Sequence, residues 1–467
     1  MPNPSFPQGN SLAARDAKSQ IHSYTNLSVH EKEGPLIIER GKGIHVWDDN
    51  GKEYIEGLAG LWCTSFGFGE EELINAAITQ MRKLPYYHSF ASKSTEPSIR
   101  LAEKLLEIAP TEFSKVFFVN SGSEANDTVV KLVWYYNNAL GRPKKKKIIA
   151  RQKGYHGVTV AAASLTGLPP LHNDFDLPIQ GILHTSCPHF YRFGLEGETE
   201  EEFASRMADD LEKLIIAEGP DTVAAFIAEP IMGAGGVIIP PVTYFEKVQA
   251  VLRKYDVLMI ADEVICGFGR TGQMWGSQTF DIQPDILSCA KALSSAYLPI
   301  AAVMVSEDIF RGMVTQSEKH GAFAHGYTYS GHPVPAAVAM RTMELMEERN
   351  ILDHVRHVSH RFSERFKALA DHPLVGEVRV CGLIGAVELV ADKKTKRSFD
   401  PKFMAGHKAY EAMQEEGVIS RAVAGDNMAL CPPLIITETE IDEMFDRFTR
   451  GLDQAAALAS KENWRED

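Results

Sequence analysis

Short apolar runs recur through the middle of the chain and alternate with stretches of helical period. A continuous apolar run is typical of a strand buried on both faces, and helices separate such strands in parallel sheets. The pattern therefore predicts an α/β domain with a mostly parallel sheet. The last run follows its predecessor after a short connection, which favours an antiparallel strand there. The predicted strands lie in 115–120, 146–151, 223–230, 256–264, 285–291 and 299–306, and the clearest helices in 125–140 and 242–256.

The pattern changes after about residue 335. A long stretch of helical period, 333–373, leads into residues 375–390, which are predicted to form an antiparallel strand pair. Two further segments, 410–423 and 427–456, complete a small α+β unit.

Near the N-terminus, residues 37–57 predict a hairpin with Asp-Asp-Asn-Gly at its turn. This hairpin has no apolar core of its own, so we expect it to join the C-terminal unit. The predicted organisation is an N-terminal arm and hairpin over 1–60, a large domain over 61–335 and a small domain over 336–467.

Composition narrows the class of protein. The chain has 467 residues, 44% of them hydrophobic, and a net charge of −14, which argues against a nucleic-acid or anionic-membrane partner. The run Lys144–Lys147 is the local exception and predicts a solvated loop before a strand. Six scattered cysteines without a CxxC pair favour a reducing cytoplasm. The first twenty residues lack an apolar signal core and are expected to be a poorly ordered arm, and no apolar run is long enough to span a bilayer.

Polar residues follow several predicted strands, at the edge of an α/β sheet where ligands bind. Ser121, Gly122 and Ser123 follow strand 115–120 and lead into a helix. Backbone N–H groups at a helix start, with hydroxyls and a glycine beside them, suit a phosphate. The same serines are also explained as an ordinary helix cap, with Glu124 near the third helical position.

Three further residues carry candidate chemistry. Asp262 either accepts a hydrogen bond from a cationic heterocycle or caps a turn. Lys291 is either a desolvated nucleophile and proton carrier or a surface lysine. Tyr155 either stacks on a ring or packs in a glycine-flanked turn. Phosphate site, carboxylate, lysine and aromatic face together match the four groups that pyridoxal 5'-phosphate (PLP) presents.

Two other motifs suggest different chemistry. Gly267–Gly272, GFGRTG, matches a dinucleotide fingerprint, but the residues after it lack helical period, so a nicotinamide oxidoreductase remains a second reading. Histidines and a cysteine in 184–189, and histidines at 354, 357 and 360, resemble metal ligands. The first group lacks an obvious fourth ligand and the second fits one exposed helix face, so no metal is expected.

From about residue 20 to 455 the chain resembles the class III aminotransferases of PLP fold type I, specifically the ω-transaminase (amine–pyruvate) branch. The resemblance implies a large domain with a mostly parallel seven-stranded sheet and a small α+β domain. It also implies a ping-pong transfer from a primary amine, with (S)-selectivity, to a keto acid such as pyruvate. The motifs that carry it are GLAGLWC, NSGSEAND, YHG, AEPIMGAGGV, ADEVICGFGRTG, DILSCAKAL, HGYTYSGHP and LCPPLIIT.

The resemblance implies a role for each matching residue. Lys291 forms the covalent Schiff base with PLP and moves the proton, and Asp262 pairs with the pyridine nitrogen. Thr328 reaches the phosphate of the neighbouring subunit, because sites in this family are completed across a dimer interface. The other implied cofactor contacts are Ser121, Gly122 and Ser123 at the phosphate, Tyr155 and Val264 on the two ring faces, and His156 and Glu229 nearby.

Substrate choice is expected to rest on other positions. Arg421 matches a mobile arginine that pairs with a substrate carboxylate in a bidentate fork. Trp62 matches the pocket tryptophan of amine–pyruvate enzymes and argues against a decarboxylating transaminase or an aminomutase, the alternatives within this fold. Whether the protein is a dimer or a tetramer is left open. The remaining pocket walls are expected from Phe90, Tyr155 and either Ala234 or Met232.

Overall fold

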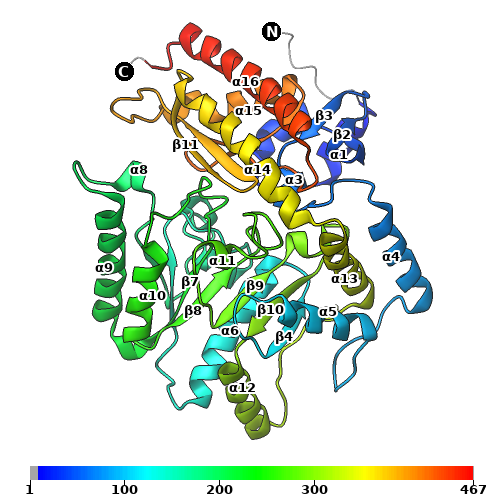
Figure 1. Cartoon of the computed structure of the whole chain (residues 1–467), viewed down its shortest axis with the longest axis vertical. Helices are drawn as coiled ribbons and strands as arrows, with labels where there is room; N and C mark the ends of the chain where they lie inside the picture. Colours follow the sequence, from blue (N-terminus) through cyan, green and yellow to red (C-terminus); the bar gives the residue numbers. More distant parts are fainter. Residues whose placement is uncertain (1–8, 466–467) are drawn as a thin grey trace.

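The computed structural model describes residues 9–465, and its centre is a seven-stranded sheet that confirms the predicted α/β class (Figure 1). The strand order is β4-β10-β9-β8-β7-β5-β6. Strand β10 pairs antiparallel with both β4 and β9, as its short connection predicted, while the other pairings are parallel. The strands are β4 (Lys115–Val119), β5 (Lys147–Arg151), β6 (Ile182–Thr185), β7 (Val223–Ala228), β8 (Leu258–Asp262), β9 (Ile286–Cys289) and β10 (Ala301–Val305).

Helices cover both faces of this sheet, and strand β7 shows why its sequence is apolar throughout. Ala225 and Ile227 pack in one buried cluster with residues of α6 (Gly122–Ala139). Phe226 points the other way, into a cluster with α9 (Glu200–Glu218) and α10 (Tyr244–Lys254). Because successive side chains alternate between two buried faces, no position of β7 is left for a polar residue.

A second sheet, in the order β11-β12-β15-β14, forms the C-terminal unit. Strands β11 (Val375–Cys381) and β12 (Ile384–Leu389) form the expected antiparallel pair. The long helical stretch before them is two helices, because Asn350 adopts a left-handed φ of 48° between them. The remaining elements of this unit are α13 (Pro333–Glu348), α14 (Ile351–Ala368), η4 (Leu369–Asp371), η5 (Pro401–Phe403), α15 (Ala405–Glu415), β14 (Arg421–Val423), β15 (Asn427–Leu430) and α16 (Glu438–Lys461).

The N-terminal strands lie beside the C-terminal elements, at the top of Figure 1. Strands β1 (Ile38–Lys42), β2 (His45–Asp48) and β3 (Glu53–Glu56) form an antiparallel sheet, and β13 (Val418–Ile419) adds to β3 in parallel. At the predicted turn, the Asp48 carboxylate accepts the backbone N–H groups of residues 50 and 52 at 3.0 and 2.9 Å. The hairpin thus closes with a side-chain acceptor at its turn.

The prediction of a poorly ordered N-terminal arm is wrong where the structure describes it. Residues Leu12–Ser19 form helix α1, and Leu27–Glu33 form helix α2. Ser11 caps the first helix by accepting the Ala14 N–H at 3.2 Å, and Asn26 caps the second. Such caps contribute about 0.5–2 kcal/mol each, a signal the apolar pattern does not carry. Residues 1–8 of the predicted arm lie outside the described residues.

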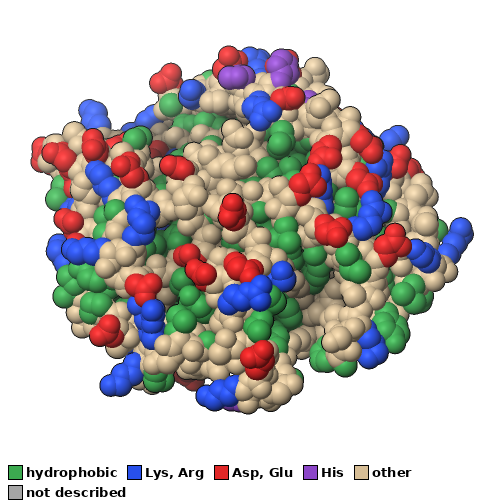
Figure 2. All heavy atoms as spheres, turned by 60° about the horizontal axis from the view of Figure 1, so that its bottom comes forward, with side chains coloured by type: hydrophobic (Ala, Val, Ile, Leu, Met, Phe, Trp, Pro, Cys, Tyr) green, Lys and Arg blue, Asp and Glu red, His purple; other side chains and the backbone are tan. Residues whose placement is uncertain are grey.

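The remaining elements complete the large unit and its connections. Within residues 9–465, no helix is long and apolar enough to cross a bilayer, and the six cysteines are free thiols. On the face shown in Figure 2, acidic and basic side chains are interspersed. The helices that complete the large unit and its connections are α3 (Ala59–Trp62), α4 (Glu71–Lys83), α5 (Glu96–Glu107), α7 (Val160–Leu165), η1 (Pro169–Leu171), α8 (Phe190–Phe193), η2 (Pro220–Thr222), α11 (Gly276–Thr279), η3 (Lys291–Ser294) and α12 (Glu307–His320).

Candidate active site

A cavity of about 810 Å³ lies at the carboxyl ends of the central strands, between the seven-stranded sheet and the segment that contains β14. It gathers most of the side chains predicted from the sequence, and its lining does not include Phe90, Thr328 or Met232, the alternative to Ala234. The predicted residues that line it are Trp62, Ser121, Gly122, Ser123, Tyr155, His156, Glu229, Ala234, Asp262, Val264, Lys291 and Arg421.

Lys291 enters this cavity on a strained piece of backbone directly after β9. Its φ is 48°, and Ser295 and Ala296 follow in the same left-handed region at 49° and 60°. The turn is held in place because the Phe66 N–H donates to the Ser295 hydroxyl at 2.9 Å. Left-handed φ at non-glycine residues costs free energy and persists where the surroundings impose it, often at functional sites.

The electrostatic surroundings of Lys291 suit a reactive amine. Burial lowers the pKa of its ammonium group, and the nearby carboxylates of Asp262 and Glu229 partly oppose this effect. A lower pKa leaves more of the amine neutral near pH 7, and the neutral amine is the form that attacks a carbonyl or accepts a proton.

Asp262, at the end of β8, is buried and held by three donors. Its Oδ2 accepts hydrogen bonds from Asn126 Nδ2 and His156 Nδ1, both at 2.8 Å. Its Oδ1 accepts the Val264 N–H at 3.1 Å. Because each carboxylate oxygen has two lone pairs, Oδ1 keeps acceptor capacity toward the cavity. The carboxylate is thus fixed in direction and still able to accept one more donor.

The start of helix α6 forms the opposite wall. Ser121 is its N-cap and accepts the Glu124 N–H at 3.2 Å, so the capping interpretation holds alongside the ligand one. Val158 N–H donates to the Ser123 hydroxyl at 3.1 Å, which leaves that hydroxyl free to donate. A Cβ at Gly122 would lie 3.1 Å from Val264 carbons, and one at Gly157 would lie 2.5 Å from Ser123 Oγ. The wall therefore requires glycine, and its free N–H groups suit an anion.

Glu229 has a positioning role that the sequence left undefined. Its two oxygens accept the backbone N–H groups of Tyr155, at 2.9 Å, and Gly233, at 3.0 Å. Burial raises the pKa of this carboxyl group. Glu229 thus ties the loop that carries Tyr155 to the loop that carries Ala234, and both loops line the cavity.

The far side of the cavity brings together residues from distant parts of the chain. Arg421 lies in β14, with its guanidinium carbon 5.9 Å from the ring centre of Tyr24. Burial lowers the pKa of Arg421, although an arginine stays protonated in proteins. Trp62 is buried beside the cavity with a φ of 64°. Met232 is fully buried in a small core cluster, so Ala234 is the residue of this loop that forms the wall.

Some residues of the site were missed from the sequence. Tyr24 lines the cavity and its hydroxyl lies 3.4 Å from that of Tyr155, yet nothing in its local sequence signals this position. Asn126 orients Asp262 through its Nδ2 group, and its Oδ1 accepts a hydrogen bond from the Ser288 hydroxyl at 2.9 Å. A buried asparagine on the apolar face of a helix needs a polar partner, which is a signal that could have identified it.

Phe90 and Thr328, which also lie outside the cavity, are exposed on the surface. Phe90 is 49% exposed, and a Cβ at Gly326 would lie 3.2 Å from its ring. Tyr86 donates its hydroxyl proton to the Thr328 carbonyl at 2.7 Å. Exposed Tyr87 and Tyr329 extend this surface of aromatic side chains.

The GFGRTG motif does not form a dinucleotide site. Residues 264–274 are turns and bends, and no helix opens at Gly267–Gly272. Instead, Arg270 Nη1 donates to the carbonyls of Leu383 and Pro432, at 3.0 and 2.6 Å. The segment connects the large sheet to the C-terminal unit, and the nicotinamide interpretation loses its structural basis.

Known proteins are similar to this chain in both sequence and architecture. The family model described as aminotransferase class-III matches residues 27–452. The chain is 55% identical over 434 residues to gamma-aminobutyrate transaminase 1 of Oryza sativa subsp. japonica, covering 92% of this chain and 84% of that protein. It is 52% identical to vanillin aminotransferase of Capsicum annuum, covering 90% and 91%. The solved structure of the omega transaminase from Pseudomonas jessenii in complex with PMP superposes with a TM-score of 0.95 at 56% identity, covering 97% and 99%.

Proposed function

Because the chain belongs to the class-III aminotransferases, which are PLP-dependent enzymes, we propose that it transfers the amino group of a primary amine to a keto acid, with pyruvate as the acceptor. The proposed donor is an ω-amino acid, a diamine or an arylalkyl amine, taken with (S)-selectivity in a ping-pong reaction. One observation carries the proposal. A single cavity joins Lys291 and Asp262 on one side to Arg421 on the other.

The residues of the cavity fit PLP. The start of α6, with Ser121, Gly122 and Ser123, offers N–H groups and hydroxyls to a phosphate, and Gly122 and the neighbouring Gly157 leave the necessary space. Asp262 offers its remaining acceptor site to the ring nitrogen, and Lys291 is the amine for covalent attachment. We place Tyr155 and Val264 on the two ring faces. When bound, PLP supplies an electron sink for negative charge that develops on the substrate carbon.

The chain's own residues supply the proton chemistry. Lys291, once free of the cofactor, takes the proton from the amino-bearing carbon of the substrate and later delivers it. The lowered pKa of Lys291 keeps this amine available as a base near neutral pH. Asp262, held by Asn126 and His156, keeps a proton on the ring nitrogen. Glu229 holds the Tyr155 loop in place and needs no contact with the reacting atoms.

Arg421 solves a problem of substrate chemistry. In a ping-pong reaction one site accepts an amine that need not carry a carboxylate and then a keto acid that does. Arg421 lines the same cavity as Lys291 and offers a planar fork for that carboxylate. Tyr24, against the guanidinium, gives it an aromatic surface when no carboxylate is bound.

Replacing Arg421 by alanine is expected to raise KM for pyruvate about 10- to 100-fold, because a charge-assisted bidentate contact is lost. KM for an uncharged aldehyde acceptor should change less than about twofold, since that substrate has no carboxylate. Steady-state kinetics with both acceptors and one amine donor measure the difference. Arg421→Lys is the control, because it keeps the charge without the fork and should fall between the two. Equal losses for both acceptors would refute the carboxylate role.

The natural donor is tested by a screen of amines against pyruvate, with alanine and the matching carbonyl compound as products. The names of the relatives make γ-aminobutyrate the first donor to try, followed by β-alanine, taurine, putrescine and a bulkier amine. Release of carbon dioxide from an amino acid, or a shifted amino group without alanine, would indicate the decarboxylating or mutase alternative.

We propose the cytoplasm as the location of the protein. The free cysteines accord with this reducing compartment.

We further propose a homodimer in which Thr328 completes the partner subunit's phosphate site. The support is that Thr328 and Phe90 match family site residues, yet both lie outside this chain's cavity on a surface with exposed aromatic side chains. Aromatic residues are enriched in the buried cores of protein interfaces.

Thr328→Ala is expected to weaken cofactor binding about 10-fold or more, because a hydrogen bond to a phosphate is worth about 1.5–3 kcal/mol. A mixture of subunits locates the residue. A hybrid dimer contains one Thr328→Ala subunit and one Lys291→Ala subunit. If the threonine acts across the interface, the site that keeps Lys291 receives an intact Thr328 from the Lys291→Ala subunit. Dialysis followed by cofactor quantification should therefore show one tightly retained cofactor in the hybrid. Weak retention in that hybrid, as in the Thr328→Ala homodimer, would show that the threonine acts within its own chain.

A further inference from the structure

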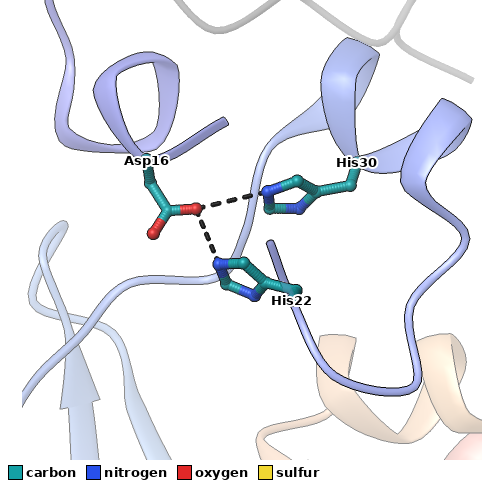
Figure 3. A group of neighbouring side chains, drawn as sticks. All are labelled: Asp16, His22 and His30. Atoms are coloured by element: carbon teal, nitrogen blue, oxygen red, sulfur yellow. Dashed lines mark ion pairs between the residues drawn. The ribbon is translucent and has the colours of Figure 1, made fainter. Parts of the chain in front are cut away.

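Three side chains of the N-terminal arm converge outside the residues that line the cavity. Asp16 lies on α1, His30 on α2 and His22 in the connection between these helices, and Figure 3 shows both imidazole rings facing the carboxylate. Asp16 Oδ1 lies 2.7 Å from His22 Nε2 and 3.3 Å from His30 Nε2. The three atoms all lie within 4.8 Å of one another.

These atoms are buried but not hydrogen bonded. None of Asp16 Oδ1, His22 Nε2 and His30 Nε2 has a hydrogen-bond partner within residues 9–465. The separations are short enough for hydrogen bonds, so the geometry fails on direction. The His30 side chain is 5% exposed. The three atoms contact one another only as ion pairs, and a cation placed among them would give each atom a partner in a suitable direction.

We propose that Asp16, His22 and His30 bind a divalent transition-metal ion, with zinc as the best match. Two imidazole nitrogens and one carboxylate oxygen form a typical three-residue zinc donor set, with water at the fourth position. Ligands about 2.0–2.1 Å from a tetrahedral ion lie roughly 3.3 Å apart. The separation between Asp16 Oδ1 and His30 Nε2 equals this value, and His22 Nε2, at 2.7 Å, has to move outward by about 0.6 Å to admit the ion. The hard ions Mg²⁺ and Ca²⁺ prefer oxygen ligands and fit this set less well.

A second cluster of similar residue types differs because cationic side chains already lie against it. His189, Glu377 and Glu388 also converge within 4.8 Å. There, however, Arg379 Nη1 donates to Glu388 Oε2 at 3.0 Å and also contacts Glu377, and Arg192 pairs with Glu388 as well. Guanidinium groups already supply the positive charge at that cluster. Within residues 9–465, the ion pairs of the Asp16 cluster involve no lysine or arginine.

The proposed ligands His22 and His30 flank Tyr24 in the sequence, so a bound ion would also affect the cavity. Tyr24 lies two residues after His22, and its hydroxyl is 3.4 Å from the Tyr155 hydroxyl. Its ring lies against Arg421, with 5.9 Å between the guanidinium carbon and the ring centre. An ion bound by His22 and His30 ties together the two ends of the segment that carries Tyr24. This consequence, unlike the metal site itself, rests on the proposed function.

Zinc titration of the chelator-treated holoenzyme, followed by calorimetry and by elemental analysis after dialysis, tests the site. We expect one zinc ion per chain, and an affinity at least about 10-fold weaker in Asp16→Asn and His22→Ala, since even indirect losses at metal sites cost that much. His357→Ala, at a histidine whose side chain is 71% exposed, is the matched control and should bind like the unchanged protein. Absence of zinc binding, or equal affinity in the two ligand variants and the control, would overturn the proposal.

Two additional measurements keep the result independent of folding and of activity. Zinc should raise the melting temperature of the unchanged protein but not of His22→Ala, because an ion that binds only the folded state stabilises it. The Lys291→Ala variant should bind zinc with unchanged stoichiometry, so a failed transaminase assignment leaves the metal result readable.

A kinetic measurement tests the link between the ion and Tyr24. Removal of zinc should raise KM for pyruvate more than it lowers kcat. An unchanged KM would contradict the link between the ion and Tyr24.

Discussion

Replacing Lys291 by alanine is expected to lower the rate of transamination about 10⁴-fold or more, because this one side chain both attaches the cofactor and transfers the proton. Alanine has no amine to attach the cofactor and no base to carry the proton between substrate and cofactor. Formation of the product alanine from pyruvate and an amine donor measures the loss of turnover. The visible absorption band of the purified protein, which depends on the lysine–cofactor bond, measures the loss of cofactor attachment and should disappear.

Lys153 supplies a matched control for this experiment. It is another lysine that lines the cavity, so Lys153→Ala removes an equal charge from the same space. That variant should keep the visible band, since its lysine is not the attachment point in the proposed assignment. Added methylamine should restore part of the activity of Lys291→Ala by acting as a free base. Transamination at the unchanged rate in Lys291→Ala would end the assignment of this residue.

The central sheet could be predicted because burial leaves a direct record in the sequence. A strand such as β7, covered on both faces, has to be apolar at every position, and the runs at 223–230 and 285–291 were found for that reason. Strand β6 was missed because it is a four-residue edge strand in which His184 interrupts the apolar run. The break at Asn350 was missed because one left-handed residue leaves the helical period on either side intact.

The same logic separates the site residues that could be predicted from those that could not. Asp262 and Lys291 follow neighbouring strands of one sheet, so their meeting follows from the sheet itself. Tyr24 and Arg421 approach each other because the N-terminal segment packs beside the C-terminal unit, and no local pattern encodes that contact. Arg421 was identified through the family resemblance, whereas Tyr24 and the Asp16 cluster became visible only in three dimensions.

Asp262→Asn is the second change with a large expected effect, a loss of about 10²–10⁴-fold in kcat. The carboxylate faces Asn126 and His156 with Oδ2 and Val264 with Oδ1. An amide has one acceptor oxygen, and the two donors at Oδ2 will orient that oxygen toward themselves. The NH₂ group then points toward Val264 N–H and the cavity, where it donates to the ring nitrogen and removes the need for a proton there.

The expected signature of Asp262→Asn is a slow chemical step in a protein that still contains its cofactor. Cofactor stoichiometry should stay near that of the unchanged protein, because the Lys291 bond and the phosphate site are intact. A donor deuterated at the amino-bearing carbon should show a larger isotope effect, since removal of that proton becomes more strongly rate-limiting. Glu263→Gln is the matched control. Its carboxylate, one residue further on, accepts bonds from Ser277 and Gly276 instead, so kcat should stay within about twofold. If Asp262→Asn retains kcat, Asp262 cannot be the residue that keeps the ring nitrogen protonated, and the electronic half of the proposed mechanism is wrong.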